Sequence, residues 1–177
     1  MIKGTKDVVL IMAYIKVAMS LRPAFEEKLV RIFGKERVKV APVKSVTRCI
    51  AKAKEYQSPA EICDYLRATI LSDTIGGTVD MLARLTENFK VVVVKDCMLK
   101  DAAGNKAFLL KLVFGDPLVQ PTECRCFGVE EQWWPKGKLV QMVCEVQITL
   151  EKLYYANKQS HLAYHPVFSG WFVGYFF

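Results

Sequence analysis

Three strand-like segments follow one another in the second half of the chain with no helix-like segment between them, at residues 90–98, 107–114 and 138–148. The first contains four consecutive valines, and the last alternates apolar with polar residues, which is typical of β-strands. Strands joined without a crossover helix usually pair as antiparallel neighbours. The sequence therefore predicts a largely antiparallel sheet, and we interpret the valine-rich segment as a buried strand.

Helix-like and further strand-like segments surround these three strands. Helical patterns occur at residues 7–20, 24–34, 45–56, 78–89 and 151–165, and shorter strands are expected at 37–40 and 61–72. Pro23 separates the first two helices, while Ser45 and Thr78 are the expected N-caps of the next two. Gly76 and Gly77 are interpreted as a break before Thr78. The helix after the strand at 61–72 predicts one crossover in a mixed sheet.

The chain has the length and composition of one α+β domain. Its 177 residues, 52% of them hydrophobic, suffice for a core without disulfide bonds. We expect an N-terminal helical pair at 1–35, a mixed sheet flanked by helices at 36–168 and an apolar tail at 169–177. The tail is too short to span a bilayer. It suits a packed terminal strand or an interface, so a homo-oligomer formed through the tail is one expectation.

Charge and cysteine usage narrow the class of partner. The formal net charge of +7 favours an anionic partner such as a nucleotide or RNA, although the same charge also serves solubility alone. The six cysteines include no C-x-x-C pair, which is typical of free thiols in a reducing compartment. We expect a cytoplasmic protein that uses neither DNA nor a membrane as its partner.

Carboxylates interrupt two of the apolar strands. Asp64 lies near the start of the segment 61–72, and Glu145 shares a strand face with Gln147. A buried carboxylate costs free energy unless it is paired or binds a cation. Asp64 and Glu145 on neighbouring strands would suit Mg²⁺, which prefers oxygen ligands.

A row of basic residues accompanies these carboxylates. Lys44, Arg48 and Lys52 are spaced four residues apart, which predicts one face of the helix at 45–56. Such a row suits phosphate groups, and with Mg²⁺ it indicates phosphoryl or nucleotidyl transfer. Two structural roles remain open: Asp64 pairs with Arg67 or Lys44, and Glu145 lies on the solvent face of the sheet.

Four segments in this order resemble the synthetase domain of RelA/SpoT-type proteins: "VKSVTRCIAKAKEY", "ICDYLRATILSD", "VVVVKDCMLKDAAGNKAFLLKLVF" and "VCEVQITLEKLYYANKQSHLAY". The resemblance covers residues 36–168. It implies a nucleotidyltransferase-like mixed sheet and the synthesis of alarmone nucleotides, as in a GTP pyrophosphokinase. Pyrophosphate would move from ATP to the 3′-hydroxyl of a nucleotide or RNA acceptor.

The resemblance also implies roles for individual residues. Asp64 and Glu145 would be the acidic residues of the site and its Mg²⁺ ligands, with Glu145 orienting or deprotonating the acceptor hydroxyl and Gln147 beside it. Seven residues would bind phosphate or nucleotide: Lys44, Ser45, Arg48, Lys52, Arg67, Lys95 and Asn105.

Two positions depart from the family pattern. Gly104-Asn105 replaces a Gly-Tyr turn whose tyrosine stacks on guanine, and Leu109 stands where a histidine is usual. The resemblance therefore implies an altered acceptor site. A nucleotide- or RNA-binding module without catalysis is the alternative function, and a structural domain that docks through its tail is a third.

Overall fold

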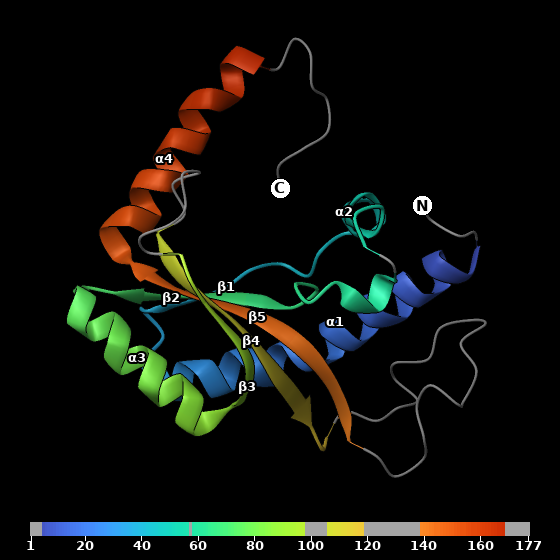
Figure 1. Ribbon diagram of the computed structural model, residues 1–177, viewed down its shortest axis with the longest axis horizontal. Coiled ribbons are helices and arrows are strands. Elements are labelled where there is room, and N and C mark those ends of the chain that lie inside the picture. Colours follow the sequence, from blue (N-terminus) through green and yellow to red (C-terminus); the bar gives the residue numbers. More distant parts are fainter. Residues whose placement is uncertain (1–4, 57, 98–105, 119–138, 169–177) are drawn as a thin grey trace.

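The computed structural model describes residues 5–56, 58–97, 106–118 and 139–168 of the chain, and side chains within 6–159 of these ranges. Figure 1 shows the elements in order: α1 (Thr5–Phe33), β1 (Val38–Val40), α2 (Val46–Ala53), the 3₁₀ turn η1 (Pro59–Glu61), β2 (Arg67–Ser72), α3 (Ile75–Asn88), β3 (Lys90–Asp96), β4 (Ala107–Asp116), β5 (Val140–Leu150) and α4 (Glu151–Phe168). The tail at 169–177 lies outside the described residues.

The strands form one five-stranded mixed sheet in the order β1-β2-β5-β4-β3. β5 pairs in parallel with β2 and antiparallel with β4, and the two remaining pairings are antiparallel. The predicted α+β class and the adjacency of the last three strands are confirmed. The crossover helix α3 carries the chain from β2 to β3, which lies at the opposite side of the sheet.

The two faces of the sheet have different surroundings. Alternate residues of β5 are buried in the core, and these include Cys144, Val146 and Ile148 at 0% exposure. α1 and α3 cover this core face, where Phe25 of α1 and Phe89 beside α3 both contact the ring of Phe114 in β4. The opposite face of β5 carries the partly buried side chains of Glu145 and Gln147. We call it the open face.

The N-terminal segment forms one continuous helix, so the predicted pair of helices is wrong. Pro23 lies inside α1 and is exposed, while Leu21 and Phe25 beside it are fully buried. Proline removes one backbone hydrogen bond, but on the solvent side of the helix that loss is offset by packing of the opposite face. The segment Lys6–Phe33 is long and apolar enough to span a membrane by length and composition. One third (33%) of its most apolar window is buried in the structure.

Two other predicted elements begin elsewhere in the structure. The strand expected at 61–72 begins only at Arg67, after the turn η1 at Pro59–Glu61 and the buried residues Asp64, Tyr65 and Leu66. The N-cap of α3 is Thr74, whose hydroxyl accepts a hydrogen bond from the Gly77 N–H, so the two glycines lie within the first turn.

β3 is an edge strand and not a buried one. Among the described strands it pairs only with β4, and its residues Val92, Val93 and Val94 are 43–49% exposed. A run of valines indicates a strand but does not distinguish an edge from the centre of a sheet. α4 contacts β5 and β2, and Figure 1 shows its C-terminal half extending away from the sheet.

Candidate active site

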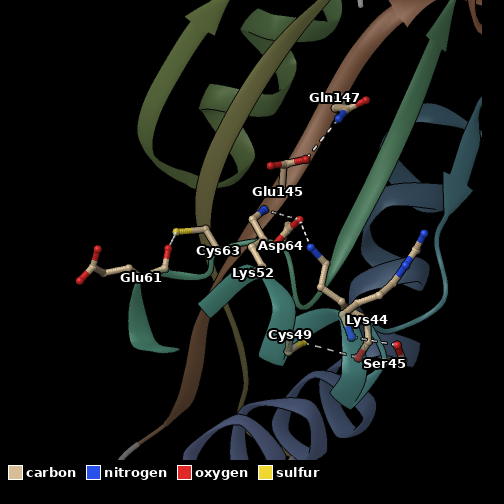
Figure 2. Close-up of polar contacts among 10 residues, drawn as sticks. Lys44, Ser45, Cys49, Lys52, Glu61, Cys63, Asp64, Glu145 and Gln147 are labelled. Atoms are coloured by element: carbon tan, nitrogen blue, oxygen red, sulfur yellow. Dashed lines mark hydrogen bonds and ion pairs between the residues drawn. The ribbon is translucent and has the colours of Figure 1, made fainter. Parts of the chain in front are cut away.

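Asp64 lies just before β2 and is joined to two lysines. Its Oδ2 accepts hydrogen bonds from the Nζ of Lys44 and from the Nζ of Lys52, the latter at 2.8 Å. The Asp64 residue is 6% exposed and Lys44 is 8% exposed. Figure 2 shows both ammonium groups converging on one carboxylate oxygen. We call Lys44, Lys52 and Asp64 the basic cluster.

The helix α2 holds the two lysines in place. Ser45 is its N-cap, as predicted, and its hydroxyl accepts a hydrogen bond from the Arg48 N–H at 3.4 Å. Lys44 therefore precedes the helix, so the predicted row on one helical face is wrong for this residue. Lys52 lies in the last turn. Both lysines still reach Asp64, because Lys44 lies where the chain enters the helix, beside the start of β2.

Opposite charges determine the protonation of the cluster. Burial alone would raise the pKa of Asp64, but the hydrogen bonds from Lys44 and Lys52 outweigh it and lower that pKa. Burial lowers the pKa of Lys44, whereas the hydrogen bond to Asp64 raises the pKa of the less buried Lys52. Asp64 is therefore an anion at neutral pH.

The second oxygen of Asp64 has a different environment. Oδ1 is buried and accepts no hydrogen bond from any residue in the described part of the chain. A buried anionic oxygen without a partner is costly, so this atom fits a cation such as Mg²⁺. No group of three or more His, Cys, Asp or Glu residues that would hold a metal occurs among the described residues, so protein ligands alone do not build a complete site there.

Glu145 lies beside the basic cluster on the open face of β5. It pairs with Arg67 across β2–β5, and its backbone N–H donates to the Leu66 carbonyl at 3.0 Å. The Gln147 amide donates to Glu145 Oε1 at 3.2 Å, as Figure 2 shows. The negative charge of Glu145 also contributes to the raised pKa of Lys52, which places the two groups near one another.

The structure brings most of the predicted site residues to one region. The parallel pairing of β2 with β5 aligns Arg67 with Glu145 and lies directly after Asp64. The alternative in which Asp64 pairs with Lys44 is confirmed as a contact, and Glu145 does lie on the face away from the core. Lys95 is exposed on β3, where it pairs with Leu109. Asn105 and the turn that contains it lie outside the described residues.

One basic residue of the open face was missed by sequence reasoning. Lys111 of β4 pairs directly with Glu145. Its only signal in the sequence is a single lysine at an alternating position of an apolar strand, which is ordinarily a solvent-facing residue. The strand register supplies the information that the sequence lacks.

The chain was compared with known proteins. No protein-family model matches the chain, and no curated protein matches it. Among solved structures, small alarmone synthetase 2 from Bacillus subtilis superposes with a TM-score of 0.67 and 16% identity, over 87% of this chain and 79% of that chain. The chain has the fold of the small alarmone synthetases.

Two further structures agree with this assignment of the fold. Small alarmone synthetase 1 from Bacillus subtilis, bound to its product pppGpp, gives a TM-score of 0.63 at 16% identity, covering 84% of this chain and 79% of that one. A GTP pyrophosphokinase family protein from Streptococcus pneumoniae gives 0.61 at 14% identity, covering 90% and 78%. The resemblance to alarmone synthetases that the sequence indicated is confirmed at the level of the fold.

Proposed function

We propose that the protein is a pyrophosphokinase-like transferase that moves pyrophosphate from ATP to the 3′-hydroxyl of a nucleotide or RNA acceptor. The observation that carries this proposal is the position of two carboxylates on adjoining parts of the sheet. Asp64, whose Oδ1 has no partner among the described residues, precedes β2, and Glu145 lies on the parallel strand β5 opposite Arg67. The fold supports it, because neighbours with the same sheet include a protein crystallised with its product pppGpp.

Each residue has a defined task in this reaction. Asp64 and Glu145 would hold Mg²⁺, which supplies charge neutralisation for the transferred phosphates when bound. Lys52 and Arg67 flank these carboxylates and would bind the donor phosphates. Glu145 would accept the proton of the acceptor hydroxyl, and the Gln147 amide holds its Oε1 in place by a hydrogen bond.

A transfer assay with labelled donor tests the proposal. The protein is incubated with Mg²⁺, ATP labelled in the γ-phosphate and GDP, GTP, ADP, AMP or tRNA in turn, and products are separated by chromatography. We expect a labelled product with at least one acceptor and release of AMP in equal amount, because pyrophosphate leaves as a unit. Glu145→Gln and Asp64→Asn should abolish the product.

Glu61→Gln provides the matched control. This carboxylate is exposed, and Figure 2 shows it pointing away from the basic cluster, so its neutralisation should leave transfer unchanged. Circular dichroism of each variant shows whether loss of activity reflects loss of fold. The absence of any product with every acceptor contradicts the transferase function.

A binding module without catalysis is the second candidate, and one contact favours it. Asp64 Oδ2 is already compensated by two ammonium groups, an arrangement that needs no metal for electrostatic balance. Nucleotide or RNA would then bind to the basic residues without turnover. Binding that weakens in Lys52→Met while no acceptor yields product supports this second function.

A further inference from the structure

Lys111 lies on the open face of β4, next to the central strand β5. Its strand neighbours Leu110 and Leu112 are fully buried in the core, so the Lys111 side chain points to the opposite face. Lys111 pairs with Glu145 across β4–β5, and Arg67 pairs with Glu145 across β2–β5. Directly paired residues share a sheet face. Arg67, Glu145 and Lys111 therefore form a row across three adjacent strands.

The charge of Lys111 is not balanced by a contact within the described part of the chain. The ion pairs there join other residues, and the hydrogen bond to the Glu145 side chain comes from Gln147. Lys111 is partly buried, as expected for a side chain that lies along the surface of the sheet. Lys111 lies opposite the Glu145 carboxylate but makes no ion pair with it, so its ammonium group is available to an anionic ligand.

A second row of residues across the open face adds further positive charge. Thr69 and Gln147 are paired across β2–β5, and the row extends to Lys39 on β1 and, through Leu109, to Lys95 on β3. Glu145 thus has cations on both adjacent strands and in the next row. The two lysines of the basic cluster are held by Asp64, whereas Lys111 is free of such a contact in the described residues.

We propose that Lys111 is a further substrate-binding residue, whose ammonium group binds a phosphate of the nucleotide held over Glu145. The inference rests on the proposed function for its ligand class, a nucleoside polyphosphate. It assigns different tasks to the lysines of the site. Lys44 and Lys52 are held by hydrogen bonds to Asp64, whereas Lys111 makes no such bond and adds a further contact to the ligand.

Equilibrium binding tests this role apart from turnover. ATP and GDP are titrated separately into the wild-type protein, Lys111→Met, Lys111→Arg and Lys35→Met, in a calorimeter and at several salt concentrations. A charge-assisted contact to phosphate implies that Lys111→Met weakens binding of one of the two nucleotides roughly tenfold to a hundredfold. Lys111→Arg should retain affinity within about threefold, because it keeps the charge.

Lys35→Met is the matched control, since Lys35 is exposed in the turn before β1 and lies off the open face. It should bind both nucleotides as the wild type does. The dependence of log Kd on log salt should be shallower in Lys111→Met alone, which a purely structural role for Lys111 would not produce. Thermal unfolding of each variant reports its fold independently.

The outcomes separate this inference from the proposed function. Equal affinity and equal salt dependence of the wild type and Lys111→Met for both nucleotides overturn the role of Lys111, even if transfer is found. Binding that depends on Lys111 without transfer to any acceptor supports the role and contradicts the transferase. A wild-type protein that binds neither nucleotide overturns both.

Discussion

The Asp64 carboxylate experiences opposing effects at the scale of single residues. Burial favours its neutral form, and the ammonium groups of Lys44 and Lys52 favour its charged form. The lysines prevail, so the carboxylate pKa in the folded protein lies below that in the unfolded chain. Such a group stabilises the fold at pH values above its unfolded pKa of about 3.9, and that stabilisation is lost as the pH falls through the folded pKa.

Asp64→Asn should therefore lower stability in a pH-dependent way. Removing one partner of a buried ion pair leaves the other charge uncompensated, so we expect a loss of about 3 kcal/mol in the free energy of unfolding at neutral pH. The difference from the wild type should shrink below about pH 4, where the wild type also loses its carboxylate charge. Urea unfolding in the presence of a chelator measures both values.

Asp73→Asn is the control for this experiment. Asp73 pairs with Arg37 at 3.0 Å, but both side chains are well exposed, at 63% and 42%. An exposed ion pair contributes about 0–1 kcal/mol, so this variant should stay close to the wild type. Parallel pH profiles for Asp64→Asn and the wild type would contradict the electrostatic account of the basic cluster.

The four described cysteines should differ in reactivity. Burial raises the pKa of Cys49 to about 11 and raises that of Cys144 as well. At about pH 8 only roughly one in a thousand Cys49 thiols is the reactive thiolate, and neither side chain is accessible. Iodoacetamide labelling followed by peptide mass spectrometry should modify the partly exposed Cys63 first.

Labelling in denaturant removes these differences and serves as the reference. Modification of Cys49 at the rate of Cys63 in the native protein would contradict its burial.

The sequence indicated most residues of the candidate site but not their contacts. Asp64 and Glu145 stood out because carboxylates are rare in apolar strands. Whether Lys44 or Arg67 contacts Asp64 depends on where β2 begins. The sequence does not show that β2 begins only at Arg67, because Tyr65 and Leu66 before it are as apolar as strand residues. Lys111 was missed because one lysine on a strand carries no information about the residue paired with it.

At the scale of elements, α3 shows how a local signal can be misread. Gly76 and Gly77 suggested a break, yet they form the first turn after the cap at Thr74. The two glycines meet different surroundings. A Cβ added at Gly76 would have open space, whereas one added at Gly77 would lie 2.6 Å from Ser72 Oγ and 3.1 Å from Thr74 Oγ1.

Alanine at these neighbouring positions should have opposite effects. Gly76→Ala should stabilise the protein by about 0.5–1 kcal/mol, because alanine loses less entropy than glycine in a helix. Gly77→Ala should destabilise it by about 1–3 kcal/mol, because buried Ser72 must shift and the cap must adjust. Thermal unfolding compares both with the wild type. A rise in Tm for Gly77→Ala would show that the turn is looser than the structure indicates.

Long-range packing also decided the elements that local rules misjudged. Pro23 did not end α1, because Leu21 and Phe25 on either side of it pack into one core. The valines of β3 correctly predicted a strand but wrongly predicted that it is buried. Its position at the edge of the sheet follows from the order of the strands, which the sequence does not show. The periodicity of apolar residues indicates local secondary structure. Both errors arose because the environment of an element depends on residues that are distant in the sequence.

At the scale of the whole molecule, α1 provides much of the core. Phe25 is fully buried and contacts Phe114 at 5.2 Å between ring centroids, whereas Met19 on the same helix is 61% exposed. Phe25→Ala should cost about 3–5 kcal/mol in the free energy of unfolding, because it leaves a cavity between helix and sheet. Met19→Ala should change it by less than about 0.5 kcal/mol.

Urea unfolding of the two variants checks this difference. Similar losses for Phe25→Ala and Met19→Ala would contradict the one-sided burial of α1 and reopen the question of a membrane-spanning role for this apolar helix.

The sheet order has a consequence for how the protein is made. Asp64 precedes β2, and its companion Glu145 lies on β5, the last of the described strands to be synthesised. At typical translation rates the ribosome adds Glu145 roughly 4–16 s after Asp64. During that interval β2 lacks its parallel neighbour, and the basic cluster has no second carboxylate beside it. No nascent chain that ends before residue 145 carries both carboxylates of the candidate site.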